Sequence, residues 1–125
     1  MKTAELKKLL DLAERAKERD LAVFSAFKSA REALADEAAN IKRKSATESA
    51  DMGASMQWQS WSLRKLAELD VKIAAAVEQE ESARSIAQKS AAKVEAIIFL
   101  IKKSTAIELH DDRRRAEQDG LPPDA

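Results

Sequence analysis

The chain has 125 residues, enough for one domain, with 45% hydrophobic and 35% charged residues and a formal net charge of +0. Its 2 glycines, 2 prolines, single histidine and lack of cysteine exclude a disulfide framework, a thiolate nucleophile, a cysteine-based metal site and a sheet with many turns. The balanced charge gives no basic field to attract nucleic acid or anionic lipid.

The first predicted element is a long amphipathic helix over residues 3–48. This stretch contains no glycine or proline, and Thr3 is a candidate N-cap. Most gaps between its apolar residues are three or four, which is typical of one helix face. The apolar stripe comprises Leu6, Leu9, Leu10, Ala13, Ala16, Val23, Phe24, Phe27, Ala30, Leu34, Ala38 and Ile41.

A turn is predicted at residues 49–56, where the sequence is small and polar and includes Gly53. A second helix is predicted at 57–119, ended by Gly120 and two prolines before a short tail, 120–125. Two of its heptad positions form a coiled-coil seam with polar interruptions. One position holds Leu66, Ile73, Glu80, Ala87, Val94 and Ile101, and the other holds Leu69, Ala76, Ala83, Ser90 and Ile97.

The two helices predict an all-α fold, a long antiparallel two-helix coiled-coil hairpin. Facing residues of antiparallel helices have a constant sum of residue numbers, and Leu6 with Ile101, Leu34 with Ile73 and Ile41 with Leu66 all give 107. This register places Phe24 opposite Ala83 and Phe27 opposite Glu80. It also leaves residues 102–118 with little or no partner inside the chain.

Two tryptophans, Trp58 and Trp61, follow the predicted turn and share one helix face. They either pack over the tip of the hairpin or form an exposed aromatic anchor for a protein partner, because tryptophan is enriched at interface hot spots.

The charged motifs favour solvent-exposed surface over chemistry. His110 has no predicted pocket around it, and the carboxylates of residues 78–81 are expected at the surface, with Glu80 a weak point in the seam. Residues 113–115 are three arginines bracketed by acidic residues, which fits a solvated helix end or an ion-pairing surface for another protein. We therefore expect no enzymatic activity, no metal site and no cofactor.

No signal peptide or membrane-spanning segment is expected. The N-terminal residues are too charged for an apolar signal core, and the most apolar stretch, residues 94–101, is far shorter than the ~20 residues that span a bilayer. The sequence predicts a soluble cytoplasmic protein.

Three segments resemble the FliJ family of flagellar type III export proteins. Residues 6–15 look like the start of the family's N-terminal helix, and residues 108–119 are similar to its charged C-terminal end. Between them, Trp58 and Trp61 precede a spaced apolar series, Leu66, Leu69 and Ile73, as an aromatic residue does in the family.

This resemblance implies a coiled-coil stalk that binds the hexameric export ATPase and the membrane export gate, and that handles export chaperones. It implies a location in the cytoplasm or at the inner face of the cell membrane, reached only through protein partners. The implied gate-binding face is Trp61, Leu66, Leu69 and Ile73, with Trp58 beside it. The implied ATPase-binding residues are Lys102, Lys103, Arg113, Arg114 and Arg115.

Two other functions remain open from the sequence. Two hairpins could associate into a dimeric four-helix bundle that covers leftover apolar residues such as Phe99, Leu100 and Ile107. A small secreted helical-hairpin effector is a third interpretation, disfavoured because the helical pattern already begins at Leu6.

Overall fold

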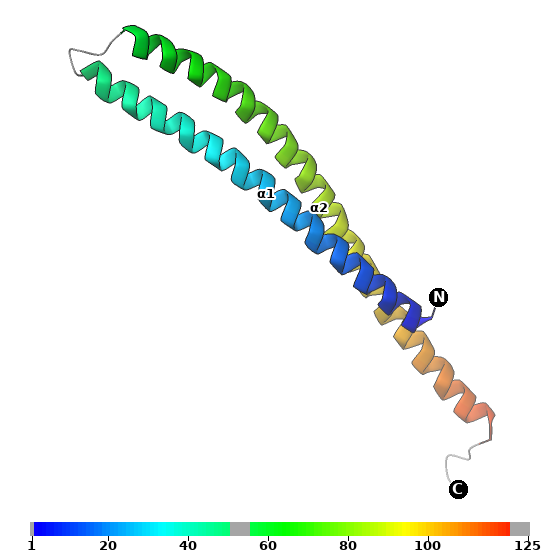
Figure 1. Ribbon diagram of the computed structural model, residues 1–125. Coiled ribbons are helices and arrows are strands. Elements are labelled where there is room, and N and C mark those ends of the chain that lie inside the picture. Colours follow the sequence, from blue (N-terminus) through cyan, green and yellow to red (C-terminus); the bar gives the residue numbers. More distant parts are fainter. Residues whose placement is uncertain (1, 51–55, 121–125) are drawn as a thin grey trace. The chain divides into compact units, whose positions relative to one another are not determined.

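In a computed structural model the chain forms two long helices, α1 (Thr3–Ala50) and α2 (Met56–Gln118), arranged as a helical hairpin (Figure 1). The structure describes residues 2–50 and 56–120, and the side chains of 2–47 and 56–120; it has no strand within these ranges. The predicted all-α helical hairpin is confirmed. Helix limits agree with the prediction to within two residues. Residues 51–55, which include Gly53 of the predicted turn, lie outside the described residues.

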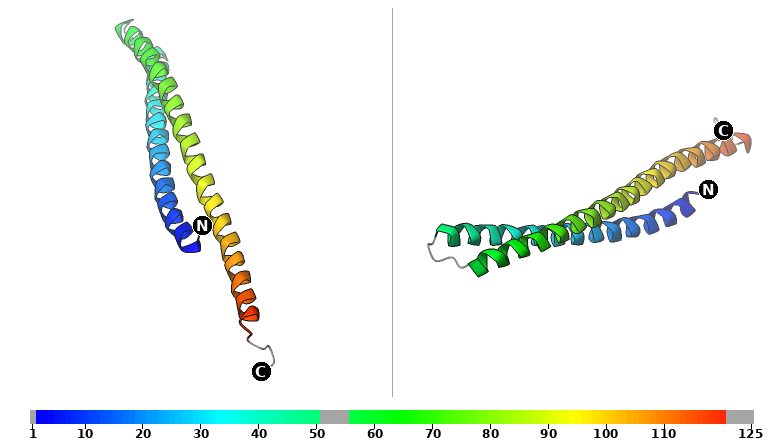
Figure 2. Two further views of the ribbon diagram at one scale, coloured as in Figure 1. Left: turned by 90° about the vertical axis from the view of Figure 1, so that its right-hand side faces the viewer. Right: turned by 90° about the horizontal axis from the view of Figure 1, so that it is seen from above.

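Contacts divide the hairpin into two units, each built from one segment of α1 and one of α2. The terminal unit consists of Met1–Arg19 and Gln88–Ala125, and the turn-side unit consists of Asp20–Ala87. Within each unit the two helical segments lie side by side, as the two views of Figure 2 show.

The core of the turn-side unit is the predicted seam. Ala38, Ile41 and Leu69 are buried, and the half-buried Leu34, Leu66 and Ile73 pack against them. The expected pairs Leu34 with Ile73 and Ile41 with Leu66 thus share one cluster, which confirms the predicted register here. The seam continues along α2 through small buried residues, which allow the helices to approach closely. These are Ala76, Ala83 and Ala87.

The buried stripe of α1 is narrower than the sequence predicts. Leu9, Val23 and Ala30 belong to the predicted apolar stripe, but all three are exposed. The reason is geometric: a two-helix seam buries two heptad positions per helix, whereas a stripe with three apolar positions suits a helix with two neighbours. The hairpin therefore leaves apolar side chains beside its seam.

In the terminal unit, cross-helix contacts extend further along α2 than predicted. Leu6 and Val94 are buried, and the Thr3 Oγ1 lies 2.9 Å from the Ser104 Oγ. The residue numbers of Thr3 and Ser104 also add to 107, so the predicted register holds in the terminal unit. The backbone N–H of Thr3 donates to the Glu108 Oε1 at 3.2 Å. The prediction that residues 102–118 have little or no partner is therefore wrong up to Glu108, because α1 begins one turn before Leu6.

Thr3 is not the N-cap that the sequence predicts. Its hydroxyl contacts Ser104, while the Lys2 carbonyl accepts the first helical hydrogen bonds, from the Glu5 and Leu6 N–H groups. Glu108 of α2 instead accepts the Thr3 N–H, one of the donors that a helix start leaves free. Hydrogen bonding from the Thr3 backbone N–H, and next from the Thr3 side chain, holds the pKa of Glu108 below its ordinary value, with smaller help from Lys7 and Lys2.

Candidate protein-binding surfaces

The predicted gate-binding face lies mainly in the core of the hairpin. Leu69 is only 1% exposed, and Leu66 and Ile73 are half-buried in the same cluster. Only Trp61, 42% exposed, presents a substantial surface to a partner. The role of these residues in partner binding stays a prediction, and for Leu69 it would require the hairpin to open.

Trp58 and Trp61 form a stacked pair near the start of α2. Their ring centroids are 5.0 Å apart with an interplanar angle of 27°. Trp58 is half-buried and Trp61 is exposed beside a shallow hollow of about 190 Å³ that Arg64, Lys65 and Glu68 also line. The pair thus combines packing on the hairpin with one exposed indole.

All five basic residues of the predicted ATPase-binding region are exposed on α2. These are Lys102, Lys103, Arg113, Arg114 and Arg115. Arg115 lies 3.9 Å from Asp112 in an exposed pair within the helix, and such pairs contribute little to stability. Every described residue from 112 to 120 is exposed. Beyond Glu108 the helix therefore presents a charged end, which finishes at Gly120 with a left-handed φ of 70°.

The turn-side unit contains a partly buried ion pair of Arg31 with Glu80. The sequence predicts Glu80 both as surface charge and as a weak point of the seam; it is 4% exposed, so the surface assignment is wrong and the seam position holds. Its carboxylate accepts from the Nε of Arg31 and, at 3.3 Å, from the Nη2 of Arg31. The Arg31 hydrogen bond holds the pKa of Glu80 below its ordinary value, and Arg84 and Lys28 add to this effect. The same bond raises the pKa of Arg31. Glu80 is therefore a structural carboxylate of the seam.

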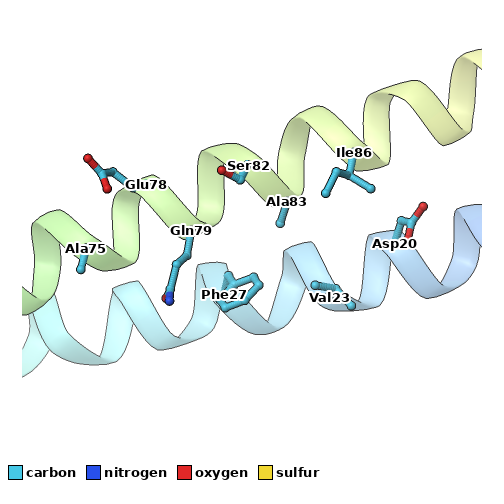
Figure 3. Close-up of a pocket in the computed structure, with 9 residues that line it drawn as sticks. All are labelled: Asp20, Val23, Phe27, Ala75, Glu78, Gln79, Ser82, Ala83 and Ile86. Carbon is cyan, nitrogen blue, oxygen red and sulfur yellow. The ribbon is translucent and has the colours of Figure 1, made fainter.

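Two of the 3 phenylalanines, Phe24 and Phe27, lie in the turn-side unit. Arg84 lies 3.9 Å from Glu80, and its guanidinium carbon is 5.5 Å from the centroid of the Phe24 ring, a cation–π distance. Phe27 lies in a groove between the helices with Gln79 and Ala83 (Figure 3). Its place opposite Glu80 in the register stays a prediction.

This feature, the turn-side groove, is an open cavity of about 460 Å³ on one flank of the turn-side unit. Figure 3 shows Val23 and Phe27 of α1 opposite Gln79 and Ala83 of α2, with Ile86 further along α2. Val23 is 45% exposed and Ile86 is 53% exposed, so two branched apolar side chains face solvent here. The remaining lining residues are Asp20, Ala75, Glu78 and Ser82.

The sequence contains a signal for this groove outside the seam positions. Val23, Gln79 and Ile86 lie one residue before a seam position, at the flanking heptad position called g. In antiparallel helices the g positions of the two partners face each other, as the ion pair of Lys65 with Glu37 at 3.8 Å shows. Charged residues usually occupy this position, so apolar residues there indicate a further contact.

The terminal unit has a second groove, of about 780 Å³, between the start of α1 and the later part of α2. Leu6, Leu100 and Ile107 form its apolar part, and charged residues from both helices lie around them. Leu100 and Ile107 also occupy the g position of α2. Phe99 and Leu109 nearby in sequence are exposed as well, so this segment of α2 displays several large apolar side chains.

Neither a metal centre nor a membrane span is found among the described residues. No group of three or more histidine, aspartate or glutamate side chains in them could hold a metal ion. No helix in the described ranges is long and apolar enough to cross a membrane. The lack of enzymatic activity stays a prediction.

The fold and its exposed surfaces define the class of the protein, a helical hairpin with apolar grooves beside its seam. Comparison of the chain with protein-family models, curated proteins and solved structures finds no match in any of the three.

Proposed function

We propose that the chain is a non-enzymatic coiled-coil stalk of the flagellar type III export apparatus. It acts in the cytoplasm, binds the hexameric export ATPase and the membrane export gate, handles export chaperones, and reaches the inner face of the membrane through these partners. The helical hairpin fold and the resemblance of residues 6–15, 58–73 and 108–119 to the FliJ family support this function.

The observation that supports it best is the free-standing end of α2. The helix continues from Glu108, which accepts the Thr3 N–H of α1, to Gln118, and its described residues from 112 onward are all exposed. A helix that projects past its partner and carries Arg113, Arg114 and Arg115 can enter the opening of a ring and pair with acidic side chains there.

The test is the ATP turnover of the flagellar export ATPase from the same organism, with and without the chain. We expect the chain to raise turnover, and deletion of residues 111–125 to abolish the rise while the hairpin stays folded, because Ser104 and Glu108 are retained. Replacement of Arg113, Arg114 and Arg115 by alanine should have most of the same effect. The matched control is the Asp111→Asn and Asp112→Asn variant in the same segment. No rise at excess chain would refute the stalk function.

A second candidate function is self-association into a dimeric four-helix bundle. The exposed Phe99, Leu100 and Ile107 of the terminal unit favour it, because burial of such a patch stabilises association. The mass in solution distinguishes the two functions: a stalk without its ring has 13.8 kDa, and a dimer has twice that mass. A dimer that Ile107→Asp converts to a monomer would favour the bundle.

A further inference from the structure

We propose that the turn-side groove is a docking site for a third helix, supplied by a protein partner, that carries lysine or arginine beside an apolar ridge. This inference does not depend on the proposed export function. It follows from the shape, the apolar residues and the charge of the groove.

The first argument is the width of the apolar surface. Beside the buried seam, α1 exposes Val23 and Ala30 and α2 exposes Ile86 on the flanks that face each other. Helices that pack in bundles have apolar residues at a third heptad position in addition to the two of the seam. The turn-side unit therefore has the side-chain pattern of a bundle with one helix missing.

The second argument is the shape of the groove. Phe27 and Ala83 lie between the two helices. Val23 lies on the α1 side of the groove and Ile86 on the α2 side (Figure 3). Ala75 and Ser82 are small, so a helix lying along the groove could approach α2 closely. Along the groove, large and small residues alternate, as they do around the holes of a coiled coil that receive a side chain from the facing helix.

The third argument is charge, and it identifies the occupant. Among the described residues that line the groove, Asp20 and Glu78 are acidic and none is basic. Glu78 is exposed at the rim, where a lysine or arginine of the incoming helix can reach it. A second copy bound through the same groove would bring two acidic patches together, because a two-fold interface joins the same patch of both copies and no described residue in this patch is basic. A basic partner helix meets no such repulsion.

The test uses the full chain and two synthetic peptides that share one heptad-repeat apolar ridge. One peptide has lysine at the flanking positions and the other has glutamate. Fluorescence anisotropy of the labelled peptides gives both dissociation constants. We expect the lysine peptide to bind about ten-fold more tightly, with a preference that shrinks at high salt. Absence of binding, or equal binding of both peptides, would overturn the proposal.

Two variants and a control locate the site on the chain. Ile86→Asp should weaken binding of the lysine peptide by about ten-fold or more, and Glu78→Lys should reverse the preference between the peptides. Val77→Asp is the matched control, because Val77 is also branched, lies on the same helix and is 40% exposed but does not line the groove. Circular dichroism confirms that each variant stays helical.

Two further outcomes also decide the question. If Val77→Asp and Ile86→Asp weaken binding equally, the peptide does not lie in this groove and the proposal fails. If the chain alone is a dimer that Ile86→Asp dissociates, a second copy occupies the groove and the basic partner helix is refuted.

Discussion

Substitution of Leu69 distinguishes a core role from a partner-binding role, because the heptad pattern places it in the seam, the family resemblance implies a partner face, and the structure buries it. Its side chain is 1% exposed between Ala38 and Ile41, so Leu69→Ala removes apolar volume from the best-packed cluster of the turn-side unit. Leucine-to-alanine changes at buried sites cost about 2–5 kcal/mol. We expect about 2.5 kcal/mol, near the lower limit, because the open flanks of a two-helix seam let neighbours move into the space.

The expected change in melting temperature follows from chain length. An unfolding entropy of about 2.1 cal/mol/K per residue gives about 0.26 kcal/mol/K for this chain, so Leu69→Ala should lower the Tm by about 10 °C. Thermal melts followed by circular dichroism measure it. Leu63→Ala is the control on the same helix: Leu63 is 69% exposed, and its Tm should change by no more than about 2 °C. Equal melting of the two variants would refute the core assignment. A loss of gate binding with unchanged Tm would instead support the role in the partner face.

The remaining predictions concern the polar contacts between the helices. Lowering the pH from 7 should destabilise the hairpin below about pH 4.5, the ordinary pKa of glutamate. The pKa values of Glu80 and Glu108 are lowered in the folded chain, so their charged forms stabilise the fold above that pH. This stability is lost as the two carboxylates are protonated. Urea midpoints across pH 3–7 test this, and a Glu80→Gln variant should show a flatter profile; an equally steep profile would contradict the assignment to Glu80. Thr3→Val should remove the contact with Ser104, cost about 1 kcal/mol and increase hydrogen exchange at the start of α1. Unchanged exchange there would show that this contact does not hold the helix start.

Much of the fold is predictable because a hairpin has few degrees of freedom. Once the heptads of Leu34 and Ile41 on α1 and of Leu66 and Ile73 on α2 are recognised, a single register number fixes their pairing, and the cluster around Leu69 confirms it. The contacts at the chain end are not predictable from the apolar pattern. Leu6 is the first large apolar residue, whereas Thr3 and its polar partners extend the pairing without any hydrophobic signal.

The candidate binding surfaces are less predictable because periodicity does not say which neighbour covers an apolar residue. Leu66, Leu69 and Ile73 have the spacing of both a seam and a partner face, and only packing shows that they belong to the seam. Val23 is the opposite case. The sequence places it in the apolar stripe of the core, whereas the structure exposes it in the turn-side groove. Assignment of a residue to the seam or to an exposed surface depends on the direction of its side chain around the helix axis. Seam and groove residues of one helix occupy neighbouring heptad positions, so a difference of one position changes the assignment.

The ion pair of Arg31 with Glu80 is also not predictable from facing heptad positions. Direct opposition in the predicted register places Arg31 against Ala76, and Glu80 lies one helical turn away. The long Arg31 side chain extends over that distance along the helix surface, so its guanidinium group reaches the Glu80 carboxylate. Pairing rules based on facing residues therefore fail for long charged side chains, although they hold for leucine and isoleucine.

The same ion pair can determine which register the hairpin adopts. The seam of α2 repeats small residues at Ala76 and Ala83, so a shift of α1 by one heptad would exchange similar apolar layers at little cost. Glu80 interrupts that repetition, because a shift that places Arg31 against Leu69 instead of Ala76 would move the guanidinium about three helical turns away from the buried carboxylate. Replacing both partners by leucine should therefore raise the Tm while permitting a second register.

Introduced cysteines can detect such a second register, since the chain has no cysteine of its own. Glu37→Cys with Lys65→Cys joins the observed pair of flanking positions, and Ala30→Cys with Lys65→Cys joins the pair expected after this shift of one heptad. In the native background only the first pair should form a disulfide. In the background with leucine at Arg31 and Glu80 both should form. A single register in both backgrounds would show that packing alone aligns the helices. It would also show that the turn-side groove, which requires Val23 and Ile86 on one flank, does not depend on the ion pair.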